Sequence, residues 1–122
     1  MAGKIRAIQF GCGPIGCAVA RLAMKRPDME LVGAVDIDAS MQGMDLGDVA
    51  GLGKKTGIRI VDDIRKVLED AGADIVFHQT SSSLRRVAPE IHQLVESGLD
   101  VVSSCEELLY PFEAQPGLAA EI

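Results

Sequence analysis

The chain has 122 residues, 48% of them hydrophobic and 25% charged, so it is long enough for one hydrophobic core and too short for two ordinary domains. Its formal net charge is −6 and the sequence has no clustered basic stripe, which argues against nucleic acid and anionic membranes as partners. Because no apolar run approaches the roughly 20 residues of a membrane span and no signal-peptide pattern is present, we expect a single compact unit in the cytoplasm.

The first predicted strand, 4–10, leads directly into a glycine-rich turn and then into a predicted helix, 14–26. The turn reads Gly11-Cys12-Gly13-Pro14-Ile15-Gly16, which has the spacing of a dinucleotide-binding fingerprint. Gly11 allows a sharp turn out of the strand, Gly13 allows backbone amides to approach a pyrophosphate, and Gly16 allows the helix to pack against the strand. The positive end of the helix dipole would then face the phosphates.

The predicted helix carries apolar side chains at helical spacing, which we expect to pack on the sheet. They are Ile15, Val19, Leu22 and Ala23. Pro14 falls in the first turn, where a missing N–H group leaves no bond unmade. Cys12 has two interpretations: a small residue that fits a tight turn, which we favour, or a thiol made reactive by the nearby helix N-terminus. The three cysteines show neither a metal-binding nor a disulfide pattern.

The second predicted strand, 30–36, ends on Asp36, at the expected distance of about 20 residues from the last glycine of the turn. A carboxylate at this place accepts hydrogen bonds from both hydroxyls of an adenosine ribose, whereas it would repel a 2′-phosphate. Two like charges about 4 Å apart cost roughly 4 kcal/mol at an effective dielectric of about 20, before screening by salt. We therefore expect NAD to be preferred over NADP. The alternative is that Asp36 only caps the loop after the strand.

The glycine-dense segment 43–57, with a short helical turn at 44–49, is the longest predicted loop. It follows the carboxyl end of the second strand, where ligands bind in parallel sheets. It therefore either folds over the adenosine or is a structural excursion, and the sequence favours neither. After the third predicted strand, 57–61, Asp62 or Asp63 is the expected N-cap of a helix at 63–71. The buried stripe of that helix would be Ile64, Val67, Leu68 and Ala71.

The fourth predicted strand, 74–78, and the fifth, 100–103, flank a helix between 84 and 97. Pro89 lies inside this helical pattern, which predicts a kink or a late start. Strand and helix signals thus alternate along the sequence. With right-handed crossovers, the alternation predicts a single-domain α/β fold of the Rossmann type, a doubly wound, mostly parallel sheet in the order 3-2-1-4-5.

Two polar segments follow the last two strands, at the end of the sheet where a nicotinamide and its ribose would lie. The first, 79–83, offers hydroxyls and backbone amides to the ribose, and its serines equally serve to cap the next helix. The second, 104–107, contains Glu106 and Glu107, which either do acid–base chemistry or, as we favour, complement a helix dipole. His78, at the end of its strand, either polarises a substrate or, as we favour, is simply packed.

Several segments together resemble the dihydrodipicolinate reductase family and, within it, the 2,4-diaminopentanoate dehydrogenase group. They are the glycine loop GCGPIG followed by VDID, the segment DLGDVAGLG at 45–53, the run 80–83, and CEELLYP at 105–111. The glycine loop is shared with many enzymes, whereas DLGDVAGLG and CEELLYP are specific to the group. The reductases have a glycine-and-threonine turn after the fifth strand. This chain has Ser103-Ser104-Cys105-Glu106 there, which argues against dihydrodipicolinate as its substrate.

The resemblance implies a set of cofactor contacts. They are Gly11, Gly13, Pro14, Ile15 and Gly16 at the pyrophosphate, Asp36 at the adenosine ribose, and Thr80 and Ser81 beside the nicotinamide ribose. It also implies a small-molecule substrate, with oxidative deamination of 2,4-diaminopentanoate and hydride transfer to NAD or NADP. The alternatives are a dihydrodipicolinate reductase-type enzyme and a non-catalytic NAD(H)-binding regulatory module. We assign no catalytic residue within the chain and expect no metal.

The last residues, 116–122, read as the start of a helix that stops after about two turns, and so short a helix has little stability of its own. We therefore expect residues 1–122 to be an NAD(P)-binding Rossmann domain that lacks a C-terminal substrate domain. The oligomeric state, a homo-oligomer included, is not fixed by these residues.

Overall fold

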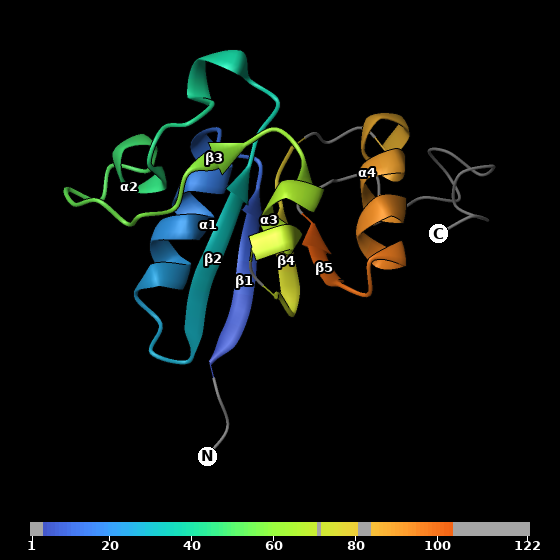
Figure 1. The fold of residues 1–122 in the computed structure, drawn as a ribbon, viewed down its shortest axis with the longest axis horizontal. Coiled ribbons are helices and arrows are strands. Elements are labelled where there is room, and N and C mark those ends of the chain that lie inside the picture. Colours follow the sequence, from blue (N-terminus) through green and yellow to red (C-terminus); the bar gives the residue numbers. More distant parts are fainter. Residues whose placement is uncertain (1–3, 71, 81–83, 104–122) are drawn as a thin grey trace.

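A computed structural model of the chain describes residues 4–70, 72–80 and 84–103. Within them, five strands form one parallel sheet in the order β3-β2-β1-β4-β5 (Figure 1). The strands are β1 (Ile5–Phe10), β2 (Met29–Val35), β3 (Ile60–Val61), β4 (Ile75–His78) and β5 (Asp100–Ser103). The Rossmann-type order predicted from the alternation of strands and helices is confirmed.

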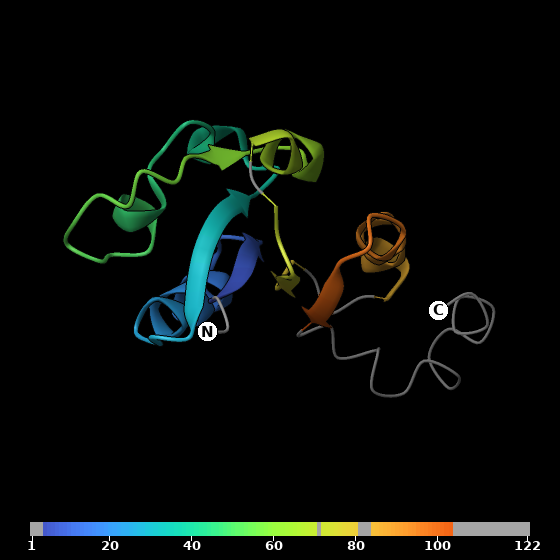
Figure 2. The same ribbon diagram turned by 60° about the horizontal axis from the view of Figure 1, so that its bottom comes forward.

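The helices cover both faces of this sheet, as a parallel sheet requires. They are α1 (Pro14–Met24), the short 3-10 helix η1 (Ala39–Met41), α2 (Leu46–Val49), α3 (Ile64–Asp70) and α4 (Leu84–Glu96). Figure 2 shows α3 and α4 on one side of the sheet and α1 on the other. None of the helices in the described ranges combines the length and the apolar character needed to cross a membrane.

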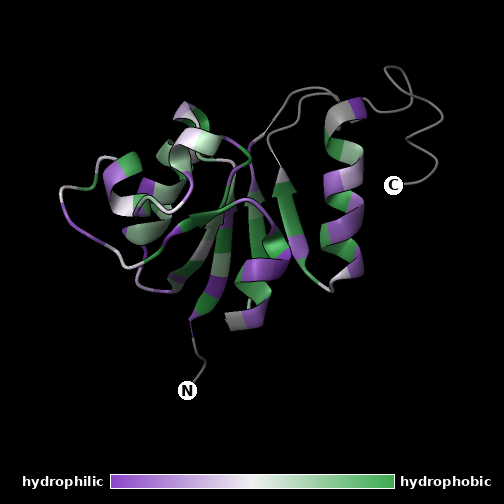
Figure 3. Ribbon diagram, turned by 45° about the horizontal axis from the view of Figure 1, so that its top comes forward, coloured by the Kyte–Doolittle hydropathy of each residue, from purple (hydrophilic) through white to green (hydrophobic). Residues whose placement is uncertain are grey.

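Alternating residues of the central strands build two different cores. Ala7 of β1 and Ala34 of β2 belong to the core under α1, whereas Ile8 and Val35, their chain neighbours, belong to the core under α3 and α4. All four side chains are fully buried. Small side chains on one face let α1 approach closely, and branched side chains fill the other face. Figure 3 shows the hydrophobic colouring of the central strands beside the mixed colouring of α4.

The face that α1 turns to the sheet differs from the predicted stripe. The buried positions are Gly16, Cys17, Ala20 and Ala23. Ile15 and Leu22 are 64% and 66% exposed, so the expectation that they pack on the sheet is wrong. The reason is the contact at Gly16: a Cβ there would lie 1.9 Å from the carbonyl oxygen of Gly11. This close approach turns the helix so that its small residues, rather than its largest apolar ones, meet the strands.

Two further expectations concern α3 and α4. Asp63 caps α3, because its Oδ1 accepts a hydrogen bond from the Arg65 N–H group at 2.9 Å. Of the predicted α3 stripe, Ile64 and Val67 are buried and Leu68 is half-buried, while position 71 lies outside the described residues.

The helix α4 begins at Leu84 and runs through Pro89, so a late start is wrong. Pro89 is exposed, and water can replace the hydrogen bond that the proline cannot make there.

The segment 43–57 is a structural excursion that packs beside α1. Leu46 and Ala50 are buried in the core under α1, and the Arg21 side chain donates to the Ala50 carbonyl at 2.9 Å. Asp45 organises the loop: its carboxylate accepts from the N–H groups of Gly47, Thr56 and Gly57 and from the Thr56 hydroxyl, at 2.7, 2.9, 2.9 and 2.8 Å. The sequence favoured neither of the loop's two roles, because this anchoring depends on residues up to twelve positions away from Asp45.

We expect Asp45→Asn to lower the midpoint of thermal unfolding by about 5 °C or more, because the NH2 group that replaces one carboxylate oxygen would face a backbone N–H donor, that of Gly57 if it takes the place of Oδ2, instead of accepting from it. The hydrogen bonds, those from Thr56 foremost, hold the pKa of Asp45 far below its ordinary value of 3.8 despite burial. A carboxyl whose pKa is lowered by folding stabilises the fold above its unfolded pKa and loses this contribution as the pH falls. The difference between wild type and variant should therefore shrink from about pH 5 downwards.

Thermal unfolding followed by circular dichroism between neutral and acid pH measures this difference. Asp48→Asn is the matched control, because the Asp48 carboxylate lies in the same loop, is 43% exposed and pairs only with Lys55 among the described residues. A difference for Asp45→Asn that stays constant with pH would contradict the role given to its carboxylate.

Candidate functional site

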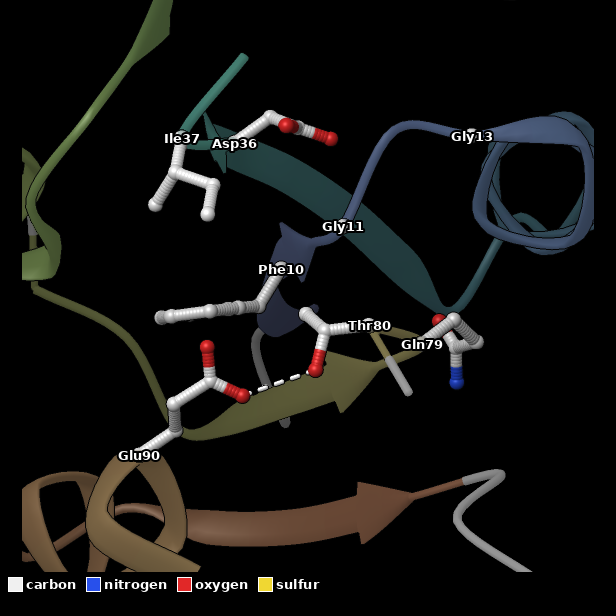
Figure 4. A pocket seen from close by; sticks show the side chains of 8 residues that line it. All are labelled: Phe10, Gly11, Gly13, Asp36, Ile37, Gln79, Thr80 and Glu90. Carbon is white, nitrogen blue, oxygen red and sulfur yellow. Dashed lines mark hydrogen bonds between the residues drawn. The ribbon is translucent and has the colours of Figure 1, made fainter. Parts of the chain in front are cut away.

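A crevice of about 200 Å³ lies at the carboxyl ends of β1, β2 and β4. Its walls come from the turn after β1, the residues after β2 and β4, and one side chain of α4 (Figure 4). The lining residues are Phe10, Gly11, Gly13, Asp36, Ile37, Gln79, Thr80 and Glu90. In open parallel sheets, ligands bind at this end of the strands, beside the point where the strand order reverses.

The glycine turn is compact because two of its glycines leave no space for a side chain. Gly11 has φ +103, and a Cβ there would lie 2.2 Å from the carbonyl oxygen of Gln79. Gly16 brings α1 against the carbonyl of Gly11 itself. Both neighbouring atoms belong to the backbone and cannot move away as a side chain would. The two glycines therefore fix how the helix N-terminus sits over β1 and β4.

Gly13 differs from these two because a Cβ at this position would meet nothing within 4 Å. It is the N-cap of α1 and provides no side-chain cap. Among the described residues, no acceptor is recorded for the N–H groups of Gly13, Ile15 and Gly16, and Pro14 has none to offer. Such unpaired N–H groups, together with the helix dipole, are the donors that bind phosphate at helix N-termini. The turn thus offers backbone N–H donors to an anion, beside the open surface at Gly13.

Asp36 is fixed at the opposite wall by backbone donors. The Cys12 N–H group donates to its Oδ2 at 2.8 Å, and the Asp38 N–H group donates to its Oδ1 at 2.9 Å. The second bond is the loop cap that the sequence offered as an alternative. Each carboxylate oxygen can accept a further hydrogen bond, so the cap leaves room for ribose hydroxyls. No lysine or arginine lines the described crevice to hold a 2′-phosphate.

A hydrogen-bonded group closes the β4 side of the crevice. The His78 ring is fully buried, with Nε2 2.8 Å from Glu90 Oε1 and Nδ1 2.8 Å from Ser103 Oγ. The Thr80 hydroxyl donates to the same Glu90 oxygen at 2.7 Å. Burial alone would raise the pKa of Glu90, but the hydrogen bonds from His78 and Thr80 outweigh it, so the pKa is lowered. His78 is therefore packed, as we favoured, and also holds a carboxylate at the crevice.

Gln9 stabilises the glycine turn by hydrogen bonds from within β1. It is fully buried in β1, and its Nε2 donates to the Gly11 carbonyl at 3.0 Å and to Gln79 Oε1 at 2.6 Å. The signal for this role was present, because Gln9 is a polar residue inside an apolar strand. Glu90 gave no such signal, since an acidic residue in an amphipathic helix normally faces solvent.

The thiols of Cys12 in the turn and Cys17 in α1 are both buried, which favours their protonated forms. Burial, and then the nearby Asp36 and Cys17, raise the pKa of Cys12 to about 12. Burial also raises the pKa of Cys17. Because a thiol must lose its proton to act as a nucleophile, Cys12 is a small packed residue, which is the interpretation we favoured. In the described part of the chain, no group of histidine, cysteine and acidic side chains is arranged to hold a metal ion.

The structure brings most of the predicted site residues together. Gly11, Gly13, Asp36 and Thr80 line one crevice, and Pro14, Ile15 and Gly16 form the first turn of α1 beside it. Ser81, Glu106 and Glu107 lie outside the described residues. The crevice also contains Gln79, the first residue of the predicted segment 79–83, and Phe10, Ile37 and Glu90, to which the sequence pattern assigned no role. The roles of all these residues toward a cofactor stay predictions.

Residues 5–104 match the family described as dihydrodipicolinate reductase, N-terminus. The chain is also 32% identical, over 98% of its length, to 2,4-diaminopentanoate dehydrogenase from Acetoanaerobium sticklandii, and it spans 34% of that protein. Among solved structures, it is similar to an amine dehydrogenase from Mycobacterium smegmatis, with 35% identity and a TM-score of 0.88 over 96% of this chain and 34% of that one.

A third similar protein is the WlbA dehydrogenase from Bordetella pertussis, solved in complex with NADH and UDP-GlcNAcA. It shares 28% identity and a TM-score of 0.60 over 84% of this chain and 28% of that one. The chain thus spans about one third of the length of the relatives that it matches over most of its own length.

Proposed function

The chain belongs to the family of dihydrodipicolinate reductase N-terminal domains and is an NAD(P)-binding domain, and from this premise we propose that it holds NAD across the crevice at the ends of β1, β2 and β4. The pyrophosphate would lie over Gly11 and accept from the N–H groups of Gly13, Ile15 and Gly16, with Pro14 shaping the helix start. The carboxylate of Asp36 would accept from the adenosine ribose. Thr80 and, beyond the described residues, Ser81 would lie beside the nicotinamide ribose.

One observation carries this assignment: open space beside Gly13, helix N–H groups with no recorded acceptor in the described part of the chain, and a fixed carboxylate all occur at a single crevice. The phosphates need the first two and a ribose needs the third. The preference for NAD over NADP rests on Asp36 and on the absence of a basic side chain among the described lining residues. The NADH bound by the similar WlbA dehydrogenase supports the same choice.

For the whole protein, we infer an amine dehydrogenase that oxidatively deaminates 2,4-diaminopentanoate, with hydride passing to the cofactor. The relative from Acetoanaerobium sticklandii and the amine dehydrogenase from Mycobacterium smegmatis support this reaction. Because the chain spans about one third of each, we propose that residues outside 1–122 bind the substrate and supply the acid–base groups. The family itself favours a second candidate, a reductase of the dihydrodipicolinate type. We also propose a cytoplasmic location, where dinucleotide cofactors are available.

Calorimetric titration of the chain with NADH and NADPH tests the binding function. We expect NADH to bind and NADPH to bind at least about tenfold more weakly, because even half of the charge repulsion estimated for a 2′-phosphate at Asp36 exceeds one decade in affinity. Preferential binding of NADPH would overturn the role of Asp36, and absence of binding by both would overturn the cofactor site. Assays of the complete protein on 2,4-diaminopentanoate and on dihydrodipicolinate then separate the two candidate reactions.

A further inference from the structure

The crevice in Figure 4 continues beyond the places assigned to the phosphates and the ribose. On the far side of Asp36 from Gly13 it is lined by Ile37, which is 80% exposed, and by the ring of Phe10. These two apolar surfaces suit a flat base. Because the base of a nucleoside is joined directly to its ribose, a ribose at Asp36 places the base in this part of the crevice. The inference that follows therefore rests on the proposed function.

The wall across from Asp36 ends in the carboxylate of Glu90. Its Oε1 accepts from both His78 and Thr80, which fixes the group in one position. For Oε2, the structure records no partner among the described residues, and Figure 4 shows this oxygen directed into the crevice. The side chain is 27% exposed, so it reaches the open space while its inner oxygen is held. An ionised carboxylate can only accept hydrogen bonds.

We propose that Glu90 reads the base of the dinucleotide by accepting a hydrogen bond from the amino group at C6 of adenine. That amino group lies on the part of the base most distant from the sugar. A base between Ile37 and Phe10, with its ribose at Asp36, therefore turns this edge toward the opposite wall. Hypoxanthine and guanine carry a carbonyl oxygen at the same position, and its lone pairs would face the carboxylate. At the C6 substituent, Glu90 thus attracts the amino group of adenine and repels the carbonyl oxygen of hypoxanthine or guanine.

The same hydrogen bonds would exist if Glu90 only closed the core around His78. That role would make the side chain matter for stability but not for the choice of base. The two roles therefore differ in one measurable quantity, the ratio of the dissociation constants of two dinucleotides that differ only at C6 of the purine. A change in the fold affects both constants, whereas recognition of the base changes their ratio.

The experiment compares NADH with its counterpart in which hypoxanthine replaces adenine, titrated into the 122-residue chain. We expect the wild type to bind NADH about tenfold more tightly, and Glu90→Gln to reduce this preference to about twofold or less, because an amide accepts at one end and donates at the other. Glu96→Gln removes the same charge from an exposed position on the same helix and should leave the preference unchanged. Circular dichroism checks that each variant folds.

Equal binding of the two dinucleotides by the wild type would overturn the inference without any variant. An undiminished preference in folded Glu90→Gln would overturn it as well. If the wild type binds neither dinucleotide, the proposed cofactor site itself fails, which is a different result from binding without discrimination.

Discussion

Replacing Gly16 with alanine should lower the stability of the chain by about 3 kcal/mol or more and prevent NADH binding. The added Cβ would lie 1.9 Å from the Gly11 carbonyl oxygen, which is less than any real contact allows. Rotating a side chain cannot relieve this contact, because the added Cβ is bonded directly to the helix backbone and the Gly11 oxygen belongs to the backbone of the turn. The helix α1 must move away from β1, and the core that contains Ala20 of α1 and Ala7 of β1 opens. Chemical denaturation followed by circular dichroism measures the loss.

Gly13→Ala is the matched control, with the opposite pattern. A Cβ at Gly13 meets nothing within 4 Å, and its φ of −75 suits any residue. We therefore expect stability to change by less than about 1 kcal/mol, the usual range for a helix N-cap exchange of this kind. Binding of NADH should nevertheless weaken by at least about tenfold, because the methyl group occupies the surface that a pyrophosphate approaches. A stable Gly16→Ala variant, or full NADH affinity in Gly13→Ala, would contradict these assignments.

Asp36→Asn should weaken NADH binding by about tenfold or more and abolish most of the discrimination against NADPH. The amide is the same size as the carboxylate, but one of its ends donates, so it cannot accept from both ribose hydroxyls while also accepting from Cys12 and Asp38. Its neutral charge removes the repulsion of a 2′-phosphate, which is the larger of the two effects. Parallel calorimetric titrations with NADH and NADPH measure both changes.

Asp38→Asn is the control for net charge. Asp38 is exposed two residues away, and its carboxylate accepts from the N–H group and hydroxyl of Ser40. We expect this variant to keep the wild-type preference for NADH. If Asp38→Asn changes the preference as much as Asp36→Asn does, the selectivity comes from the general negative charge of the rim. Direct recognition of the ribose by Asp36 would then be excluded.

The topology could be predicted from the sequence because its signals are local. The apolar pattern that predicts each strand or helix lies within the residues of that element, and the crossover rule then orders the strands. The glycine turn could be predicted for the same reason, since its spacing is typical of a single junction between a strand and a helix. Asp36 lies at the end of the very next strand, so its place in the crevice also follows from the chain order.

The face of α1 could not be predicted, because it is set by a contact between two parts of the turn. Hydrophobic spacing favoured Ile15 and Leu22, yet the approach of Gly16 to the Gly11 carbonyl turns these residues outward. The place of Glu90 in the site could not be predicted for a similar reason. Nothing in α4 separates Glu90 from Glu96, and the distinction arises only where the helix passes His78.

A crystal structure of the chain with NADH tests the central claim most directly. We predict the pyrophosphate on the N–H groups of Gly13 and Ile15, and both hydroxyls of the adenosine ribose within hydrogen-bond distance of Asp36. Adenine would lie between Ile37 and Phe10. Phosphates bound away from the first turn of α1, or a ribose that does not touch Asp36, would contradict the account.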